Sequence, residues 1–354
     1  MRWLITLFVT LLVVCGVRAD TFLYVSMAPE KKIQIYRLDP ADGKLTAVDT
    51  VAVDGTPGAI GIDPAKKYLI VALRNTPALA SFAIDPGTGK IKLLSKAVLA
   101  KGEDAAFVGT DRSGQWVISA SYGAGKVFVH GLKDGNLSAE PVQNIKTKVT
   151  AHAFATDPKN TWVWVPHVAP NVIYQFKFNA ETGKLTESGW AMGGDVKVGP
   201  RHLAIHPKLD MAYTSDESGS SITAYRFDNE LGLSAVQLLS TLPADFKKGN
   251  STAEVKIHPS GKFVWVSNRG HDSLAGFAID AKGKLTSLGQ TPTEKTPRSF
   301  DIDPDGQYVF GAGEGSGKLA VFRVDLTTGA LTRIHTFDVG KSLPWVLAVK
   351  LPAK

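Results

Sequence analysis

Side chains able to do acid–base and anion chemistry recur at two fixed positions of a repeated pattern. The pattern is anchored by an Asp or His, namely Asp63, Asp111, Asp157, His206, His258 and Asp303. Four or five residues before an anchor lie His152, Arg201, His202, Glu254 and Arg298. Eleven residues after an anchor lie Arg74, Tyr122, Glu217, Arg269 and Glu314. Imidazole and carboxylate groups can activate water, and guanidinium groups can stabilise an oxyanion.

Several of these residues also have a purely structural interpretation. Arg201 and Arg298 each follow a proline and can simply pair with a neighbouring carboxylate. We favour a functional role for Arg201 because three cationic or imidazole groups share its repeat position. For His152 and His202, hydrogen bonding to backbone carbonyls is an equally good interpretation.

The elements that position these side chains are short strands. An apolar stretch, Asp-Pro or His-Pro, a small turn and an alternating strand recur, as in IDPAKKYLIVA from Ile62. Successive anchors are 48, 46, 49, 52 and 45 residues apart, a spacing that fits four strands per unit. A second strand pair follows each anchor, with turns such as DPGTGKI, so every unit is two hairpins. Repeated four-stranded sheets are typical of propeller blades.

The two chain ends complete a seventh unit. The C-terminal PWVLAVK resembles the first strand of a blade that then stops, and the N-terminal TFLYVSMAPEKKIQIYRLDPADGKL supplies the other three. Closing the ring in this way removes exposed sheet edges. The sequence therefore predicts an all-β, seven-bladed β-propeller with four antiparallel strands per blade. An open pair of β-sandwiches is the alternative, but it does not explain the split unit.

Strand direction predicts where the chemistry lies. Because antiparallel strands alternate in direction, the loop before the first strand and the loop between the second and third open on the same end of the ring. The Asp-Pro and Thr-Gly turns open on the other end. We expect the two rings of active side chains to share one channel mouth, on loops held by a rigid scaffold. His206 and His258, at the other end, are expected to be structural.

The N-terminus predicts export. Arg2 precedes an apolar run over residues 4–14, and Val17-Arg18-Ala19 offers small residues for cleavage. This pattern indicates a signal peptide over residues 1–19. A membrane anchor is the alternative, but the run is shorter than the ~20 residues of a span. A lipoprotein interpretation of Cys15 is weaker still, because a valine precedes it.

Residues 20–354 are expected to form one domain, without membrane insertion after cleavage, in a periplasmic or secreted protein. Loss of Arg2 and Arg18 lowers the formal net charge by two, from +7 to +5. The remaining charges are interspersed, which argues against a nucleic-acid partner. Cys15 is the only cysteine, so the mature chain has no thiol. No HExxH, P-loop or GxSxG motif occurs. We expect a monomer without a cofactor or metal ion.

The chain resembles a known family in several longer segments. These are GPRHLAIHP from Gly199, SDESGSSITAY from Ser215, SNRGHDSLAGFAID from Ser267, TPTEKTPRSFDIDPDGQYVFGAG from Thr291 and VGKSLPWV from Val339. They look like those of propeller-type 6-phosphogluconolactonases of the lactonase family. The likeness covers essentially the whole mature chain.

The resemblance implies a metal-independent lactonase, or a relative such as the carboxymuconate-cyclising enzymes. In the wider family a His, two Arg and a Glu are the supposed catalytic set, matching His152, Arg201, Arg269 and Glu217. Many relatives have His-x-His where this chain has Thr150-Ala151-His152, and an Asn where it has Asp216 before the functional Glu. Family 6-phosphogluconolactonases usually act in the cytoplasm, so the export signal makes a non-phosphorylated sugar lactone plausible.

We therefore predict ring opening of a sugar lactone, with or without a phosphate or carboxylate. Glu217 or His152 would activate water, and Arg201 and Arg269 would stabilise the oxyanion. Substrate binding is assigned to His202, Glu254, Arg298, Tyr122 and Arg74, with Arg298 on an anionic group. The alternatives are a non-enzymatic cell-envelope propeller that binds a carbohydrate or protein, and a muconate-lactone-type cyclase.

Overall fold

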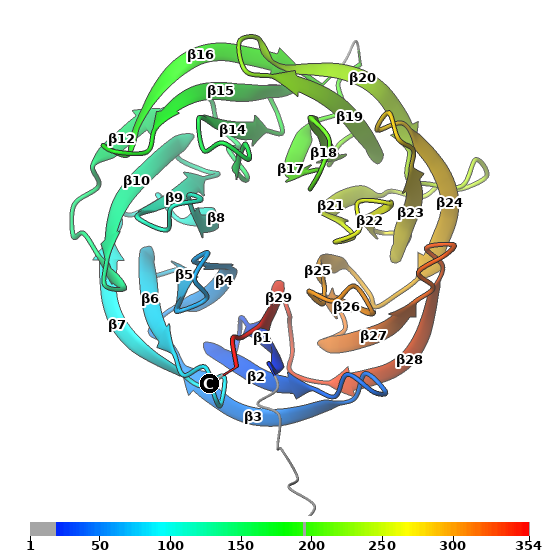
Figure 1. The fold of residues 1–354 in the computed structure, drawn as a ribbon, viewed down its shortest axis with the longest axis horizontal. Coiled ribbons are helices and arrows are strands. Elements are labelled where there is room, and N and C mark those ends of the chain that lie inside the picture. Colours follow the sequence, from blue (N-terminus) through cyan, green and yellow to red (C-terminus); the bar gives the residue numbers. More distant parts are fainter. Residues whose placement is uncertain (1–18, 194–195, 354) are drawn as a thin grey trace, which may run out of the picture.

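The computed structural model describes residues 19–193 and 196–353 of the chain. The predicted signal peptide, except for Ala19, lies outside the described residues. The described residues form strands β1 to β29, arranged as seven sheets around a central axis (Figure 1). They contain no helix long and apolar enough to cross a membrane. The predicted all-β, seven-bladed architecture is confirmed.

Six blades take their strands from consecutive sequence, with the first strand innermost. The first three of them are β4 (Thr56–Ile62), β5 (Tyr68–Arg74), β6 (Ala78–Ile84) and β7 (Ile91–Val98); β8 (Ala105–Thr110), β9 (Trp116–Ser121), β10 (Lys126–Lys133) and β12 (Gln143–Lys146), with β11 (Asn136–Leu137) also on β10; and β13 (Ala155–Thr156), β14 (Trp162–His167), β15 (Val172–Asn179) and β16 (Lys184–Met192).

The next three blades follow the same order. They are β17 (Pro200–Ile205), β18 (Met211–Asp216), β19 (Ser221–Asp228) and β20 (Gly232–Ser240); β21 (Ser251–Ile257), β22 (Phe263–Arg269), β23 (Ser273–Ile279) and β24 (Leu285–Pro292); and β25 (Pro297–Ile302), β26 (Tyr308–Gly313), β27 (Lys318–Val324) and β28 (Leu331–Asp338).

The seventh blade closes the ring from both chain ends, as predicted. Its innermost strand is β29 (Trp345–Lys350), which pairs antiparallel with β1 (Thr21–Met27), followed by β2 (Lys32–Leu38) and β3 (Leu45–Ala52). Figure 1 shows β29 and β1 side by side at the channel side of this blade. The described N- and C-terminal segments are therefore held by sheet hydrogen bonds.

Burial follows the position of a strand within its blade. Second strands such as β22 are apolar on both faces because each blade packs between two neighbours, and Trp265 is almost completely buried there. Fourth strands such as β24 form the outer edge of their blades, and most of their residues are exposed or half-buried. Because neighbouring blades pack face to face, each blade holds its inner strand beside the channel.

The repeated anchors build tight turns at one end of the ring. Asp63 Oδ1 accepts hydrogen bonds from the backbone N–H of Lys67 and Tyr68, at 2.7 and 2.6 Å. Where a histidine replaces the aspartate, Nδ1 takes over the acceptor role: His206 Nδ1 accepts from the N–H of Leu209 at 2.9 Å. Its Nε2 then donates to Gly261 O of the next blade. The structural role expected for this histidine is confirmed.

Candidate active site

A repeated backbone irregularity aims side chains into one mouth of the channel. Where an inner strand pairs with its neighbour, the register shifts at the start of the strand, which places Ala106, Arg201 and Arg298 in bulges. A bulge adds one residue and redirects its side chain. In the blade of β13, His152 follows an isolated bridge between Ala151 and His167 instead of lying in a strand.

The second ring of side chains comes from the far ends of the second strands. Arg74 ends β5, Arg269 ends β22, and Glu217 directly follows β18. Second strands run antiparallel to inner strands, so their ends meet the bulges at the same channel mouth. The predicted convergence of the two rings is therefore present in the fold.

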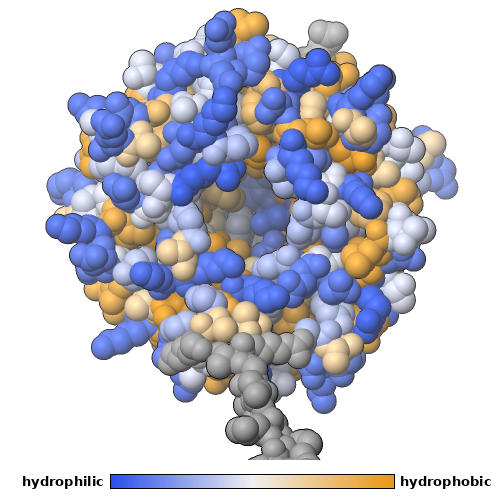
Figure 2. Space-filling model, in the orientation of Figure 1, coloured by the Kyte–Doolittle hydropathy of each residue, from blue (hydrophilic) through white to orange (hydrophobic). Residues whose placement is uncertain are grey.

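A cavity of about 200 Å³ lies where the two rings meet. Its walls are formed by Arg74, Ala106, Tyr122, His152, Glu217, Arg269 and Arg298. Three guanidinium groups and one carboxylate face this space, which gives it a positive balance suited to an anionic ligand. Figure 2 shows the other end of the channel, the one that carries the Asp-Pro turns, where the centre of the ring is also hollow.

Glu217 is held by two arginines from two blades. Its Oε2 lies 3.1 Å from Arg201 Nε, and its Oε1 lies 3.0 Å from Arg269 Nη2. Arg201 Nη1 also donates to Ala253 O at 2.8 Å, and Arg269 Nη2 to Thr252 O at 2.9 Å. Both guanidinium groups are thus fixed on two sides, so the carboxylate has a defined position.

Some polar atoms of this cluster are not satisfied within the protein. Arg201 Nε, Arg269 Nε and Glu217 Oε2 are buried without a hydrogen-bond partner among the described residues. The 3.1 Å contact between Arg201 and Glu217 is an ion pair whose N–H does not point at the oxygen. Leaving a buried donor unsatisfied costs about 1–3 kcal/mol. These atoms therefore favour a ligand that brings oxygen and hydroxyl groups.

His152 belongs to a buried chain of three titratable groups. His152 Nδ1 lies 3.2 Å from His202 Nε2, and His202 Nδ1 lies 2.8 Å from Glu254 Oε1. Glu254 Oε1 also accepts the N–H of Val255 at 3.0 Å. The histidines therefore bond to each other and to a carboxylate, and not to backbone carbonyls.

Burial sets the charge state of these groups. Desolvation and the charges of Arg201 and Arg298 lower the pKa of His152 well below its ordinary value. Desolvation lowers the pKa of His202 to about 4, although Glu254 opposes the shift. Burial raises the pKa of Glu254, but His202, Lys256 and Arg201 outweigh it and leave that pKa below its ordinary value. At neutral pH both imidazoles are neutral and the carboxylate is ionised.

The remaining wall carries a second cationic group. Arg298 Nη1 lies 3.6 Å from Glu314 Oε2, a loose ion pair. Desolvation, followed by the charge of Arg298, lowers the pKa of Arg74. Two positive side chains thus lie near each other with one carboxylate beside them.

Most of the predicted site residues line one cavity, and the others are buried behind it. Arg74, Tyr122, His152, Glu217, Arg269 and Arg298 line the cavity. Arg201, His202 and Glu254 are 1%, 2% and 3% exposed. This placement favours a supporting role for His202 and Glu254 over the direct substrate contact that the sequence suggested.

Two groups of side chains that support the site were not predicted from the sequence. Phe107 and Trp345 pack edge-on or tilted against His202, with ring centroids 5.4 and 5.9 Å away. Asp216, next to Glu217, is fully buried and accepts hydrogen bonds from Thr214, Ser221 and Thr223. The PWV segment and the Asp before Glu217 were visible in the sequence, but their burial was not.

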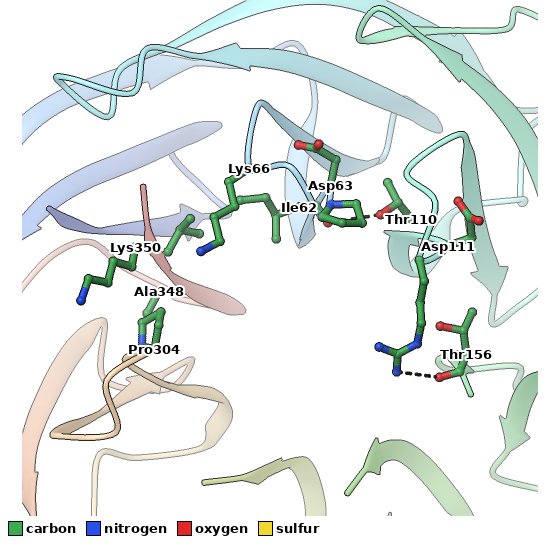
Figure 3. A pocket seen from close by; sticks show the side chains of 12 residues that line it. Ile62, Asp63, Lys66, Thr110, Asp111, Thr156, Pro304, Ala348 and Lys350 are labelled. Atoms are coloured by element: carbon green, nitrogen blue, oxygen red, sulfur yellow. Dashed lines mark hydrogen bonds between the residues drawn. The ribbon is translucent and has the colours of Figure 1, made fainter. Parts of the chain in front are cut away.

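A larger cavity of about 370 Å³ lies at the opposite mouth (Figure 3). It is lined by the turn anchors Asp63 and Asp111 and by Arg112, whose guanidinium donates to the carbonyls of Asp157 and Thr156. These side chains are occupied in holding turns and neighbouring blades together. The smaller cavity, whose walls carry a histidine, a glutamate and arginines, is therefore the candidate active site, as the sequence predicts.

No preformed metal-binding cluster is present in the part of the chain that the structure describes. Within residues 19–193 and 196–353, no group of three or more His, Cys, Asp or Glu side chains is arranged to hold a metal ion. The arrangement instead combines a neutral imidazole with fixed guanidinium groups.

The fold and the cavity define a seven-bladed propeller with a basic, histidine-containing site at one channel mouth. A sequence model described as "Lactonase, 7-bladed beta-propeller" matches residues 16–102 and 96–348, and the chain belongs to this family. It is 32% identical to a 6-phosphogluconolactonase of Pectobacterium carotovorum, over 93% of this chain and 98% of the relative. It is also 32% identical to a 6-phosphogluconolactonase of Yersinia pestis, over 92% and 96%.

Solved structures confirm the architecture. A Lactobacillus plantarum protein has 26% identity and a TM-score of 0.86, over 94% of this chain and 100% of that chain. The periplasmic gluconolactonase of Pseudomonas aeruginosa has 22% identity and a TM-score of 0.87, over the same shares. The second likeness shows the fold alone.

Proposed function

We propose that the protein hydrolyses the ring ester of a sugar lactone at the cavity between His152 and Arg298. The observation that carries the proposal is a neutral imidazole in the same cavity wall as a carboxylate fixed by two guanidinium groups. The 6-phosphogluconolactonase names of the 32% identical relatives support the same reaction class.

His152 is the general base in this proposal. Glu217 has both oxygens in ion pairs with arginines, so its role in this proposal is to orient those arginines. The lowered pKa of His152 keeps its imidazole unprotonated at neutral pH. The imidazole takes a proton from water as the water oxygen bonds to the lactone carbonyl carbon. The bond from that carbon to the ring oxygen then breaks, and the imidazolium returns the proton to this oxygen, giving a hydroxy acid.

The arginines stabilise the negative charge that develops on the carbonyl oxygen. Arg269 lies on the cavity wall and has an unpartnered buried Nε, so it is the proposed oxyanion donor. A single preorganised donor contributes roughly 3 kcal/mol to lowering such a barrier. Arg201 acts behind it, by fixing Glu217.

Arg298 and Arg74 are the proposed subsite for an anionic group on the substrate. Guanidinium groups bind phosphate and carboxylate oxygens with two N–H donors. The loose 3.6 Å pairing of Arg298 with Glu314 leaves its remaining donors for a ligand. This subsite is compatible with a 6-phosphate, and assays with phosphorylated and neutral lactones distinguish the two kinds of substrate.

A pH-stat assay tests the proposal. δ-Gluconolactone and its 6-phosphate are each added to the protein, and acid release is corrected for spontaneous ring opening. The expected result is saturable acceleration that Glu217→Gln abolishes. Binding without acid release by either lactone would instead support a carbohydrate-binding scaffold and would contradict the proposal.

We also propose that the chain is exported and that cleavage follows Ala19. The support is the sequence pattern alone, with Arg2, the apolar run over residues 4–14 and the small residues before Asp20. N-terminal sequencing of protein from the periplasmic fraction or the medium tests this, with Asp20 expected as the first residue.

A further inference from the structure

The hydrogen-bond chain behind the cavity has only one consistent direction. Glu254 is ionised and can only accept, so His202 Nδ1, at 2.8 Å from its Oε1, carries a proton. His202 is neutral, so its Nε2 has none and accepts. The partner of Nε2 at 3.2 Å is His152 Nδ1, which therefore carries the next proton.

This direction leaves one nitrogen of His152 for chemistry. Nδ1 is used by His202, and Nε2 makes no hydrogen bond to any residue that the structure describes. His152 lines the cavity, while His202 and Glu254 lie behind it and do not. The lone pair on Nε2 thus belongs to the ring edge away from the buried chain.

We propose that Glu254 and His202 are positioning residues that hold His152 in the tautomer with its proton on Nδ1 and its lone pair on Nε2, ready to accept a proton from water. This inference rests on the proposed lactone hydrolysis. In this arrangement a second group orients the base, and a buried carboxylate orients that second group. A catalytic triad uses the same arrangement with a different set of residues.

The environment fixes each member of the chain. Phe107 and Trp345 hold the ring of His202, and Tyr122 packs edge-on against His152 with centroids 5.5 Å apart. The half-buried Lys256 and the buried Arg201 balance the charge of Glu254. Arg201, Arg298 and Arg269 face His152 and oppose its protonation, whereas the Glu254 charge, transmitted through His202, favours the imidazolium that forms in the reaction.

Nitrogen NMR of the protein labelled with ¹⁵N-histidine tests the two tautomers directly. At pH 7, both His152 and His202 are expected as Nδ1–H tautomers, with signals assigned by single substitutions. His152 protonated on Nε2 at this pH would overturn the proposal.

Kinetics separate positioning from packing. His202→Phe keeps the ring volume and removes the acceptor for His152, so kcat should fall about 100-fold with KM changed by less than about 3-fold. His202→Gln places an amide oxygen near the lost Nε2 and should recover about 10-fold of that loss. Equal loss in the two variants, or full activity in His202→Phe, would overturn the proposal.

Glu254→Gln tests the charge at the end of the chain. It should lower kcat and move the acid limb of the kcat profile to lower pH, because the imidazolium of His152 loses a stabilising charge. His167→Gln is the matched control: His167 is equally buried and bonds Val165 O and Thr147 Oγ1, away from the cavity. The control should change thermal stability and leave the pH profile in place.

These experiments distinguish failure of the positioning role from failure of the proposed lactone hydrolysis. If the wild-type protein accelerates no lactone, the proposed function is wrong, while the NMR tautomers still decide the hydrogen-bond direction. If the wild-type protein is active and His202→Phe retains its kcat, only the positioning role is wrong.

Discussion

Glu217 and Arg269 form an ion pair of 3.0 Å between equivalent positions of successive blades. Each follows its anchor by eleven residues, and the two are 52 residues apart, which is the distance between His206 and His258. The ring geometry therefore converts a sequence repeat into a side-chain contact. His202 and Glu254, also 52 residues apart, form their 2.8 Å contact by the same rule.

Glu217→Gln should inactivate the enzyme without unfolding it. The neutral amide cannot balance Arg201 and Arg269, so both guanidinium groups lose the contact that orients them. We expect kcat to fall about 100-fold or more. Tm should fall by less than about 5 °C, because the Glu217 side chain is 24% exposed and solvent moderates its loss.

The comparison for this variant is Glu103→Gln. Glu103 pairs with Lys126 and is also partly buried, but it does not line the cavity. Steady-state kinetics and thermal melts of both variants check the prediction. Wild-type kcat in Glu217→Gln would show that the central ion pairs have no part in turnover.

Arg298→Met should separate substrates by charge. The apolar side chain keeps much of the volume but removes the proposed anchor for a phosphate or carboxylate. KM for the 6-phosphate of δ-gluconolactone should rise at least about 10-fold, with KM for the neutral lactone changed by less than about 3-fold. An equal change in both KM values would place Arg298 outside the anionic subsite.

Activity should persist into acid solution. A general base works while it is unprotonated, and burial with the surrounding arginine charges lowers the pKa of His152 well below its ordinary value. As pH falls, kcat/KM should therefore remain level through pH 6.5 and decline only at lower pH. A profile of kcat/KM from pH 4 to pH 9, each point within the stable range of the fold, checks this. An acid limb centred at or above pH 6.5 would exclude His152 as the base.

The repeat made the fold and the ring positions predictable from the sequence. Anchor spacing gives the strand count of a blade, and strand parity gives the shared mouth of His152 and Arg298. The repeat did not predict whether a given side chain reaches the cavity or is buried between the blades. One-residue bulges decide whether a side chain faces the cavity, as Arg298 does, or the space between blades, as Glu254 does. Such shifts depend on pairing with the neighbouring strand and leave no clear signal in a single chain.

The same limit explains why the histidines had two open interpretations. A sequence shows that His152 and His202 precede successive anchors, but their 3.2 Å contact depends on the packing of two blades. In the structure the two imidazoles bond to each other, and His202 also bonds to Glu254.

Asp216→Asn should stabilise the protein above neutral pH. Burial raises the pKa of Asp216 to about 7, although hydroxyl donors from Thr214, Thr223 and Ser221 oppose the shift. A carboxyl group with a raised folded-state pKa contributes stability below its unfolded value of 3.8, and this contribution is lost as pH rises toward 7. Asparagine has no such loss, so the variant should gain on the wild type by up to about 4 kcal/mol between pH 4 and pH 8.

Asn268→Asp is the reciprocal test of this buried position. Asn268 precedes Arg269 as Asp216 precedes Glu217, and its Nδ2 donates to Thr241 O and Ser273 Oγ. Aspartate there loses these donors and must bury a charge above neutral pH, so it should destabilise the fold most at pH 8. Chemical denaturation of both variants at pH 4, 6 and 8 measures the effects. If the free energy of unfolding of Asp216→Asn follows that of the wild type in parallel across this range, Asp216 does not titrate between these pH values.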